Sequence, residues 1–393
     1  MFNDKKYNSI VGAITKLINT SLEKAGIDYS YSPIISELFN GEGFYIANYE
    51  RAICRPKIWG YDIHWAYGGA LLNDYPLSNN AEVYNGKNKT SLGFFICKFT
   101  RLTKRYKNYD YTLFLNKVVS EPKNKNKYIM LFNFEYEIFK DMYDTDVKII
   151  KKYYFQQIGK LPFADLVEKY YKKKKESEDC YKCAYEAGFY GKLAQNFKRE
   201  EINEEDKPWQ KEEKFFRNQI LDMVEKTYKI PKGQSYKLRD RRCIIASLQT
   251  AYTRHKEWQV FKKYEPYIVY MNTDSVHFNN NVEFETSDAV GHYGIEYNGD
   301  TIQYIRRAAY IVLNNTQDKV IKSKIGGVIN DELLQNIDTV NKLFYGQCVK
   351  ANTYESEEHR RNDVRTLITL APLYFEEYTH LTDAEEYQKR KGA

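Results

Sequence analysis

The chain has 393 residues, 42% of them hydrophobic, and its 60 Lys and Arg outnumber 53 Asp and Glu to give a formal net charge of +7. This length predicts two or more subdomains with a buried core. No apolar run reaches the ~18 residues of a membrane span, and the first residues lack the apolar core of a signal peptide, so the sequence predicts no membrane contact and a cytoplasmic protein.

The predicted elements begin with two helices. Apolar residues at helical spacing predict a helix over residues 7–26, and a second helix is expected over residues 32–39. The stretch Phe39–Phe44 contains Gly41 and Gly43 and is typical of a turn that leads into a strand.

A strand predicted over residues 58–64 carries Asp62, and Tyr67 follows five residues later. Beyond it, residues 77–160 indicate a small α+β unit with polar loops rich in Asn and Lys. Its clearest strand candidates are Gly93–Phe99 and Tyr128–Phe132.

Residues 162–196 predict a pair of helices, and this segment contains the basic run Lys172–Lys175. Small residues recur there at three- and four-residue spacing and form one stripe: Cys180, Cys183, Ala184, Ala187, Gly191 and Ala194. Such a face suits either close helix packing or the approach of a flat ligand. A strongly charged segment follows over residues 198–235.

A helix predicted over residues 238–262 leads into Tyr267–Phe278, where two apolar runs flank a polar tetrad. Asn272-Thr273-Asp274-Ser275 has turn chemistry, so we expect a tight β-hairpin with Asp274 at its bend. A carboxylate there lies outside the hydrophobic layer and can meet a metal ion, although an Asp in such a turn usually only forms the turn. Residues 329–393 are expected to be mostly helical.

Three motifs in this order resemble those of family B DNA polymerases of the protein-primed branch. The family patterns are Asp-x-x-Ser-Leu-Tyr-Pro, Asn-Ser-x-Tyr-Gly and Tyr-x-Asp-Thr-Asp-Ser. The corresponding segments here are Asp62–Gly68, Ala187–Gly191 and Tyr270–Ser275. The departures include Trp65 for Ser, Ala66 for Leu and Asn272 for Asp. The resemblance covers roughly residues 30–350.

The resemblance implies an α+β, right-hand polymerase fold with palm, fingers and thumb around an antiparallel palm sheet. The implied segments are N-terminal helices (1–45), first palm part (46–76), a first insertion for duplex and priming-protein contact (77–160), fingers (161–197), a second insertion (198–235), second palm part (236–290), and thumb with C-terminal helices (291–393).

The resemblance also implies a two-metal site for Mg²⁺ or Mn²⁺. Asp62 and Asp274 are its implied catalytic ligands, with Ile63 through its carbonyl and Asn272 through its amide as further ligands. Two carboxylates can suffice for two Mg²⁺ ions because these ions keep bound waters.

Two further sets of residues carry over by position. The dNTP set is Tyr67, Lys175, Lys182, Gly188 and Tyr190. Lys182 lies eight residues before Tyr190, whereas the family's lysine lies seven before its tyrosine, at Cys183, and one residue turns a helical side chain by about 100°. The DNA set is Gly43, Gly191, Lys192, Thr273, Arg307, Tyr310 and Lys324.

The implied function is templated DNA synthesis from a DNA 3′ end or a protein primer. The implied partners are primer-template DNA, dNTPs and a terminal priming protein. Too few residues precede the palm for an exonuclease domain, so we expect no proofreading in this chain, unless by a separately encoded exonuclease. Two alternatives stay open: a catalytically degenerate DNA-binding replication protein, and an untemplated nucleotidyltransferase.

Overall fold

The computed structural model describes most of the chain. The described residues are 4–30, 32–48, 54–120, 125–197, 203–205, 211, 215, 218, 238–306, 308–314, 316–317, 319–325, 332–344, 347–353 and 366–370. Most of the expected second insertion, 198–235, therefore lies outside the described residues.

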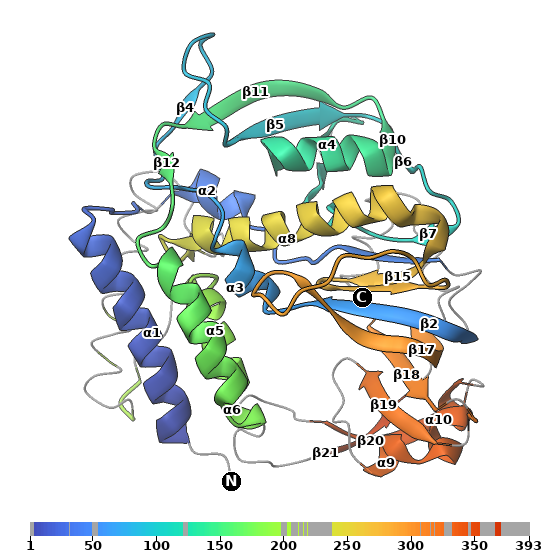
Figure 1. The fold of residues 1–393 in the computed structure, drawn as a ribbon. Coiled ribbons are helices and arrows are strands. Elements are labelled where there is room, and N and C mark those ends of the chain that lie inside the picture. The colour runs from blue at the N-terminus through green and yellow to red at the C-terminus, as the bar shows by residue number, and fades with distance from the viewer. Residues whose placement is uncertain are drawn as a thin grey trace.

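An eight-stranded antiparallel sheet forms the centre of the molecule, as the sequence predicts (Figure 1). In spatial order its strands are β19 (Val320–Ile325), β18 (Ala309–Leu313), β17 (Tyr293–Arg306), β2 (Cys54–Ile63), β16 (Ser275–Phe278), β15 (Ile268–Asn272), β1 (Tyr45–Asn48) and β7 (Tyr109–Asp110). β2 is paired on both sides with strands that lie more than 200 residues later in the sequence. The sheet continues through β17, β18 and β19, past the expected start of the thumb at residue 291.

The side chains of this sheet alternate between its two faces, as the pleat of a strand requires. Tyr61 and Ile63 of β2 belong to the core beneath one face, together with Val276 of β16. Ile58 of β2 belongs instead to a cluster rich in tyrosine on the other face, which also holds Tyr270. Asp62 lies between Tyr61 and Ile63, so it points to the tyrosine side of the sheet.

The long helix α8 (Cys243–Tyr264) separates this sheet from a second one (Figure 1). It is buried along most of its length, which is typical of a helix enclosed by other elements. The second sheet has the order β4 (Ala81–Val83), β11 (Lys148–Phe155), β5 (Gly93–Phe99), β9 (Lys127–Phe132) and β8 (Val119–Ser120), and α4 (Asn133–Met142) packs between it and α8. Both predicted strand candidates of this region are confirmed.

The first half of α8 packs into a helical layer. This layer contains α1 (Asp4–Lys24), α2 (Pro33–Leu38), α3 (Ala66–Ala70), α5 (Val167–Glu176), α6 (Asp179–Glu186) and a π-helical turn, η3 (Ala187–Gly191). The predicted helices 7–26 and 32–39 and the helical pair in 162–196 are thereby confirmed. The helix predicted over 238–262 is confirmed from Cys243 onward, whereas Leu238–Arg239 form the short strand β14.

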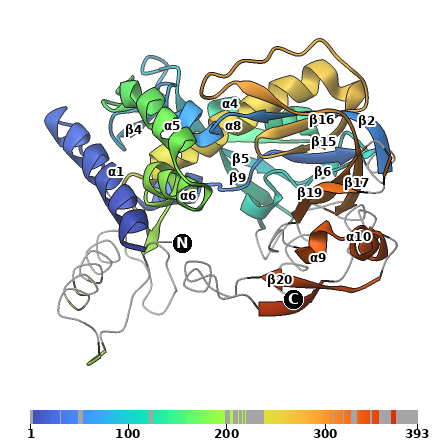
Figure 2. The same cartoon turned by 60° about the horizontal axis from the view of Figure 1, so that its bottom comes forward.

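The C-terminal part packs beside β19 and differs from its prediction (Figure 2). Two short helices, α9 (Glu332–Gln335) and α10 (Ile337–Phe344), are followed by an antiparallel pair, β20 (Val349–Thr353) and β21 (Thr366–Leu370). The expectation that 329–393 is mostly helical is therefore wrong for these two segments. Cross-strand pairing with a distant segment supplies the strand conformation, and a local helical period cannot reveal it.

Short elements complete the described chain. They are the pairs β3 (Tyr75–Pro76) with β12 (Ile158–Gly159), β6 (Leu102–Lys104) with β10 (Tyr143–Thr145), and β13 (Asn196–Phe197) with β14 (Leu238–Arg239), and the 3₁₀ turns η1 (Leu115–Lys117), η2 (Ala164–Leu166) and η4 (Glu265–Tyr267). No helix of the described part is both long and apolar enough to cross a membrane.

Candidate active site

A two-residue turn brings Asp274 beside Asp62. Asn272 and Ser275 pair across the hairpin of β15 and β16, which leaves Thr273 and Asp274 as the turn. Thr273 has φ 63°, a left-handed conformation that a β-branched residue rarely adopts, and such strain is typical of functional sites. Ser275 then pairs with Asp62 of β2, and the Ile63 amide donates to the Asp274 carbonyl at 2.7 Å.

The two carboxyl groups lie where negative charge is costly. Burial raises the pKa of Asp274, and the nearby charge of Asp62 raises it further. Burial likewise raises the pKa of Asp62, against the opposing charges of Lys324, Lys322 and Lys174. Two neighbouring carboxylates that resist ionisation are stabilised by a bound cation. The donor set consists of oxygens, which suits Mg²⁺ or Mn²⁺.

The protein supplies only a small number of charged ligands. Within the described ranges, no group of three or more His, Cys, Asp or Glu side chains is arranged to hold a metal ion. The other oxygens at the turn are neutral. Asn272 carries its amide oxygen at the end of β15, where the Thr273 hydroxyl donates to it at 3.4 Å.

The turn is supported from below by Gly43. The Thr273 amide donates to the Phe44 carbonyl at 2.8 Å. A Cβ atom on Gly43 would lie 2.3 Å from the Thr273 hydroxyl oxygen and 2.9 Å from the Thr273 Cα. Only glycine fits there without a shift, so Gly43 fixes the position of the β15–β16 hairpin. Its predicted DNA contact stays a prediction.

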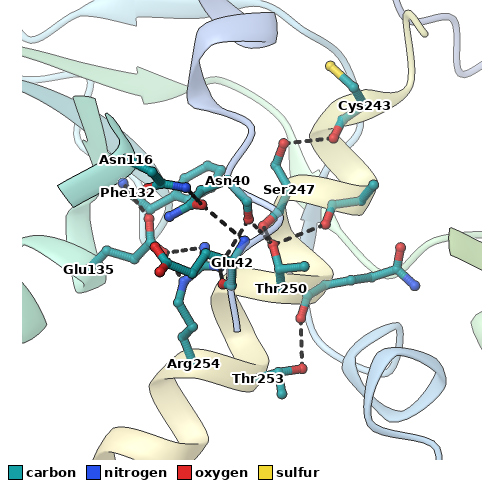
Figure 3. Close-up of polar contacts among 12 residues, drawn as sticks. Asn40, Glu42, Asn116, Phe132, Glu135, Cys243, Ser247, Thr250, Thr253 and Arg254 are labelled. Carbon is teal, nitrogen blue, oxygen red and sulfur yellow. Dashed lines mark hydrogen bonds and ion pairs between the residues drawn. The ribbon is translucent and has the colours of Figure 1, made fainter. Parts of the chain in front are cut away.

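A buried arginine holds the loop that carries Gly43 (Figure 3). Arg254 of α8 is 1% exposed and donates to Glu135 Oε1 of α4 at 2.8 Å from Nε and 2.6 Å from Nη2. It also donates to the Asn40 carbonyl at 3.0 Å and to the Glu42 carbonyl. The Thr250 hydroxyl, one turn earlier, donates to the Asn40 carbonyl at 2.7 Å. Nothing in the sequence indicates this clamp, because Arg254 stands among other polar and charged residues of α8, Thr253, His255, Lys256 and Glu257.

Two of the predicted dNTP residues come together. The rings of Tyr67 on α3 and Tyr190 on η3 are stacked, with centroids 4.5 Å apart and planes at 24°. Burial raises the pKa of Tyr67, with further increases from Tyr190 and Asp274, which places Tyr67 close to the carboxylates. The Gln249 side chain of α8 donates to the Tyr67 carbonyl at 2.9 Å and so holds α3 from behind.

A lysine of α5 other than the predicted Lys175 lies near the candidate carboxylates. Lys174 is 19% exposed, forms an ion pair of 2.5 Å with Glu186, and lies 5.2 Å from the centre of the Trp65 ring. Its charge acts on Asp62. Lys175, one residue later, lies over the Tyr171 ring at 4.8 Å. Because all four residues of the run Lys172–Lys175 are lysines, the sequence alone did not indicate which of them lies near the carboxylates.

Three residues of the small-residue stripe, Cys183, Ala184 and Ala187, pack against α1. A Cβ atom on Gly188 would lie 2.8 Å from Ile14, and Ala184 belongs to a cluster with Tyr7 and Val11. Gly188 thus has a packing role, and its contact with a nucleotide stays a prediction. Gly191 and Lys192 are exposed at the end of the π-turn.

On the other side of the carboxylates, two lysines of β19 share one glutamate of β17. Glu296 Oε1 lies 2.7 Å from the Lys322 ammonium and 3.1 Å from that of Lys324. Lys324 also lies 5.8 Å from the centre of the Tyr310 ring. Tyr310 is 2% exposed, so a contact with DNA requires some movement of its neighbours. Arg307 lies outside the described residues.

No protein-family model and no curated protein matches this sequence. The fold, however, is similar to solved structures of phi29 DNA polymerase. With the complex of that polymerase with primer-template DNA and incoming nucleotide substrates, the TM-score is 0.59 at 14% identity, over 93% of this chain and 66% of that one. With its binary primer-template complex, the TM-score is 0.52 at 15% identity, over 86% and 61%.

The chain therefore spans slightly less than two thirds of the length of that polymerase. At this identity the similarity shows the fold alone: the chain has a polymerase-like α+β fold with a palm-like antiparallel sheet.

Proposed function

We propose that this chain is a DNA-directed DNA polymerase, which adds dNTPs to a DNA 3′ end or to the hydroxyl of a priming protein. The observation that carries the proposal is the pairing of Ser275 with Asp62, which sets Asp274 and Asp62 side by side. The stacked tyrosines Tyr67 and Tyr190 lie next to this pair. The polymerase-like fold supports the same conclusion.

Asp62 and Asp274 would hold two divalent cations, with Asn272 and the Ile63 carbonyl as neutral oxygen donors. When bound, the cations would activate the primer hydroxyl and neutralise the triphosphate. The chain contributes a rigid frame for the carboxylates through the bond from the Ile63 amide to the Asp274 carbonyl and through Gly43 beneath the turn.

Tyr67 would lie under the deoxyribose and reject a 2′-hydroxyl by contact. The stack on Tyr190 and the bond from Gln249 to its carbonyl both limit the movement of Tyr67. A restrained ring discriminates better than a mobile one, because it cannot move aside for the larger sugar.

Lys174 of α5 and Lys182 of α6 would bind the triphosphate, and Lys175 follows Lys174 on α5. The Lys192 amide donates to the Ala187 carbonyl at 2.8 Å, five residues earlier, so η3 holds one residue more than an α-helical turn. Because Tyr190 lies within this π-turn, its rotation relative to Lys182 differs from that in a regular helix, which supports a role for Lys182 despite its one-residue shift from the family pattern.

DNA would lie along the tyrosine side of the sheet. Thr273 at the turn and Lys324 on β19 border the carboxylates on this side, and the Lys324 charge acts on both of them. Gly43, Gly191, Lys192, Arg307 and Tyr310 are the further DNA contacts that we propose. Lysines suit this role because phosphate binding requires positive charge.

The test is extension of a primer by the wild-type chain with Mg²⁺ or Mn²⁺, on templated and on blunt, untemplated ends. The proposal predicts incorporation that follows the template base and stops in EDTA. Equal incorporation of all four nucleotides on both ends would instead identify an untemplated transferase.

A catalytically inactive DNA-binding protein is the second candidate. Asn272 favours this candidate, because the family motif that Tyr270–Ser275 resembles has a charged Asp at this position. Tight binding of primer-template DNA without incorporation under either metal would establish this candidate.

A further inference from the structure

A cavity lies on the opposite side of β2 from Asp62. It has a volume of about 410 Å³ and is enclosed by α3, by the middle of α8 and by residues 290–292. Ile63 lines it, and Ile63 points away from the face to which Asp62 points because successive strand residues alternate. The cavity is therefore separate from the candidate active site, although it lies directly behind it.

We propose that this cavity binds a mononucleotide. Its floor is apolar, formed by Ile63, Ala66, Ala70 and Val290, and Tyr252 adds an aromatic ring to the wall. Its cationic or protonatable residues are Lys256, His255 and His292, and none of the described residues that line it is Asp or Glu. The volume falls in the range of about 300–1,000 Å³ that is usual for small-molecule sites.

Lys256 is the anchor for the phosphate. It is half-buried, and burial lowers its pKa. Its ammonium donates to the Gly291 carbonyl and forms no ion pair with any carboxylate of the described part of the chain. The neighbouring Glu257 accepts a hydrogen bond from the Tyr293 hydroxyl, and burial raises the pKa of Glu257. The charges of Glu257 and Glu285 oppose the lowering of the Lys256 pKa, but neither carboxylate forms an ion pair with Lys256. A half-buried ammonium with donors left over favours an anionic ligand.

A small side chain, that of Ala66, lines the cavity. Ala66 stands where the resembling motif has leucine, and its small side chain leaves the floor open. Ala66 and Ala70 belong to α3, which also carries Tyr67. A ligand in the cavity therefore touches the helix that places the tyrosine beside the active-site carboxylates, and it would reinforce the hold of Gln249 on that helix.

The test is calorimetric titration of the full chain with AMP in EDTA, which removes the metals that nucleotide binding at Asp62 and Asp274 needs. We expect one site, and binding weaker by at least about tenfold in Lys256→Met, since a charged hydrogen bond is lost. The matched control is Lys262→Met, on the same helix but over the Trp258 ring and outside the cavity. Asp62→Asn should bind AMP like the wild type.

Ala66→Leu gives a second, independent variant, because it restores the side chain of the resembling motif and fills the floor. It should keep the wild-type melting temperature and lose AMP binding. The proposal is overturned if the wild type binds no AMP, or if Lys256→Met and Ala66→Leu bind it unchanged. Binding of inorganic phosphate as tight as that of AMP would overturn the role of the apolar floor. None of these results depends on polymerase activity.

Discussion

Asn272 ends in a neutral amide next to two carboxyl groups whose pKa values burial already raises. Without cations, a third carboxylate there would add repulsion, whereas with cations it would add a charged ligand. In the proposed metal site, the residue at position 272 would thus set both the Mg²⁺ requirement and the repulsion between the carboxylates without metal.

Asn272→Asp should consequently lower the Mg²⁺ concentration for half-maximal primer extension. It should also lower the melting temperature in EDTA and regain it when Mg²⁺ is added. The measurement is a Mg²⁺ titration of extension rate alongside thermal unfolding with and without metal. A higher Mg²⁺ requirement, or slower extension at saturation, would show that the site has adapted to asparagine.

Glu257 predicts a pH dependence of stability. Burial raises its pKa in the folded chain well above 4.5. Below about pH 4.3, Glu257 is protonated in both the folded and the unfolded chain. At higher pH the unfolded state releases the proton while the folded state keeps it, so this residue's contribution to stability falls as pH rises.

Glu257→Gln keeps an oxygen to accept from Tyr293 and cannot ionise. Urea unfolding between pH 5 and 8 should therefore show a smaller decline of stability in Glu257→Gln than in the wild type, and a more stable variant at pH 8. Parallel pH profiles of the two proteins would refute the assignment of a protonated Glu257.

At the scale of elements, the loop before β1 packs against the hairpin of β15 and β16 and fixes the position of its turn. A methyl group on Gly43 would collide with both the side chain and the Cα atom of Thr273. The collision must displace the turn, because backbone atoms cannot move aside as a flexible side chain can.

Gly43→Ala should therefore reduce the rate of incorporation while primer-template affinity changes little. Thr273→Gly removes the clashing side chain and also suits the φ of 63°, so the double variant should recover part of the rate. No recovery in the double variant would assign the defect to DNA contact by Gly43 instead.

Helix α8 also supports α3 through one bond, from Gln249 to the Tyr67 carbonyl. Gln249→Met should weaken discrimination between dNTP and NTP by raising NTP incorporation, with a smaller effect on dNTP incorporation. Gln259→Met, on the exposed side of the same helix, serves as the control. Equal losses with both sugars would mean that Gln249 only stabilises the fold.

At the scale of the whole molecule, Arg254 and Glu135 tie the second sheet to the central one through α8 and α4. Removal of one partner of a buried ion pair costs about 3–5 kcal/mol, while joint replacement by apolar residues costs far less. Glu135→Ala should thus destabilise the chain strongly, and Glu135→Leu with Arg254→Met should cost less than Glu135→Ala.

Urea unfolding measures both effects. The control is Asp144→Ala, which breaks the exposed pair of Asp144 with Arg101 and should change stability by no more than about 1 kcal/mol. If Glu135→Ala and Asp144→Ala lower the free energy of unfolding by similar amounts, the buried pair of Arg254 and Glu135 does not join the two sheets.

The features that were predictable from the sequence depend on local patterns. Apolar runs rich in strand-favouring residues, together with turn chemistry, predicted the Asp274 hairpin, and helical spacing predicted α1 and α8. The choice of Lys174 over Lys175 depends on the rotation of one helix against its neighbours, which no local pattern records. The Arg254 clamp and the cavity behind β2 arise from contacts between distant segments, and β20 and β21 gain their conformation from each other.

The central claim is that Asp62 and Asp274 together support metal-dependent incorporation. The most direct measurement is single-nucleotide incorporation at saturating Mn²⁺, with primer-template affinity measured in the same samples. We predict that Asp62→Asn and Asp274→Asn each lose incorporation by on the order of 10²–10³-fold, while DNA affinity stays at the wild-type value. Incorporation by Asp62→Asn at the wild-type rate would contradict this claim.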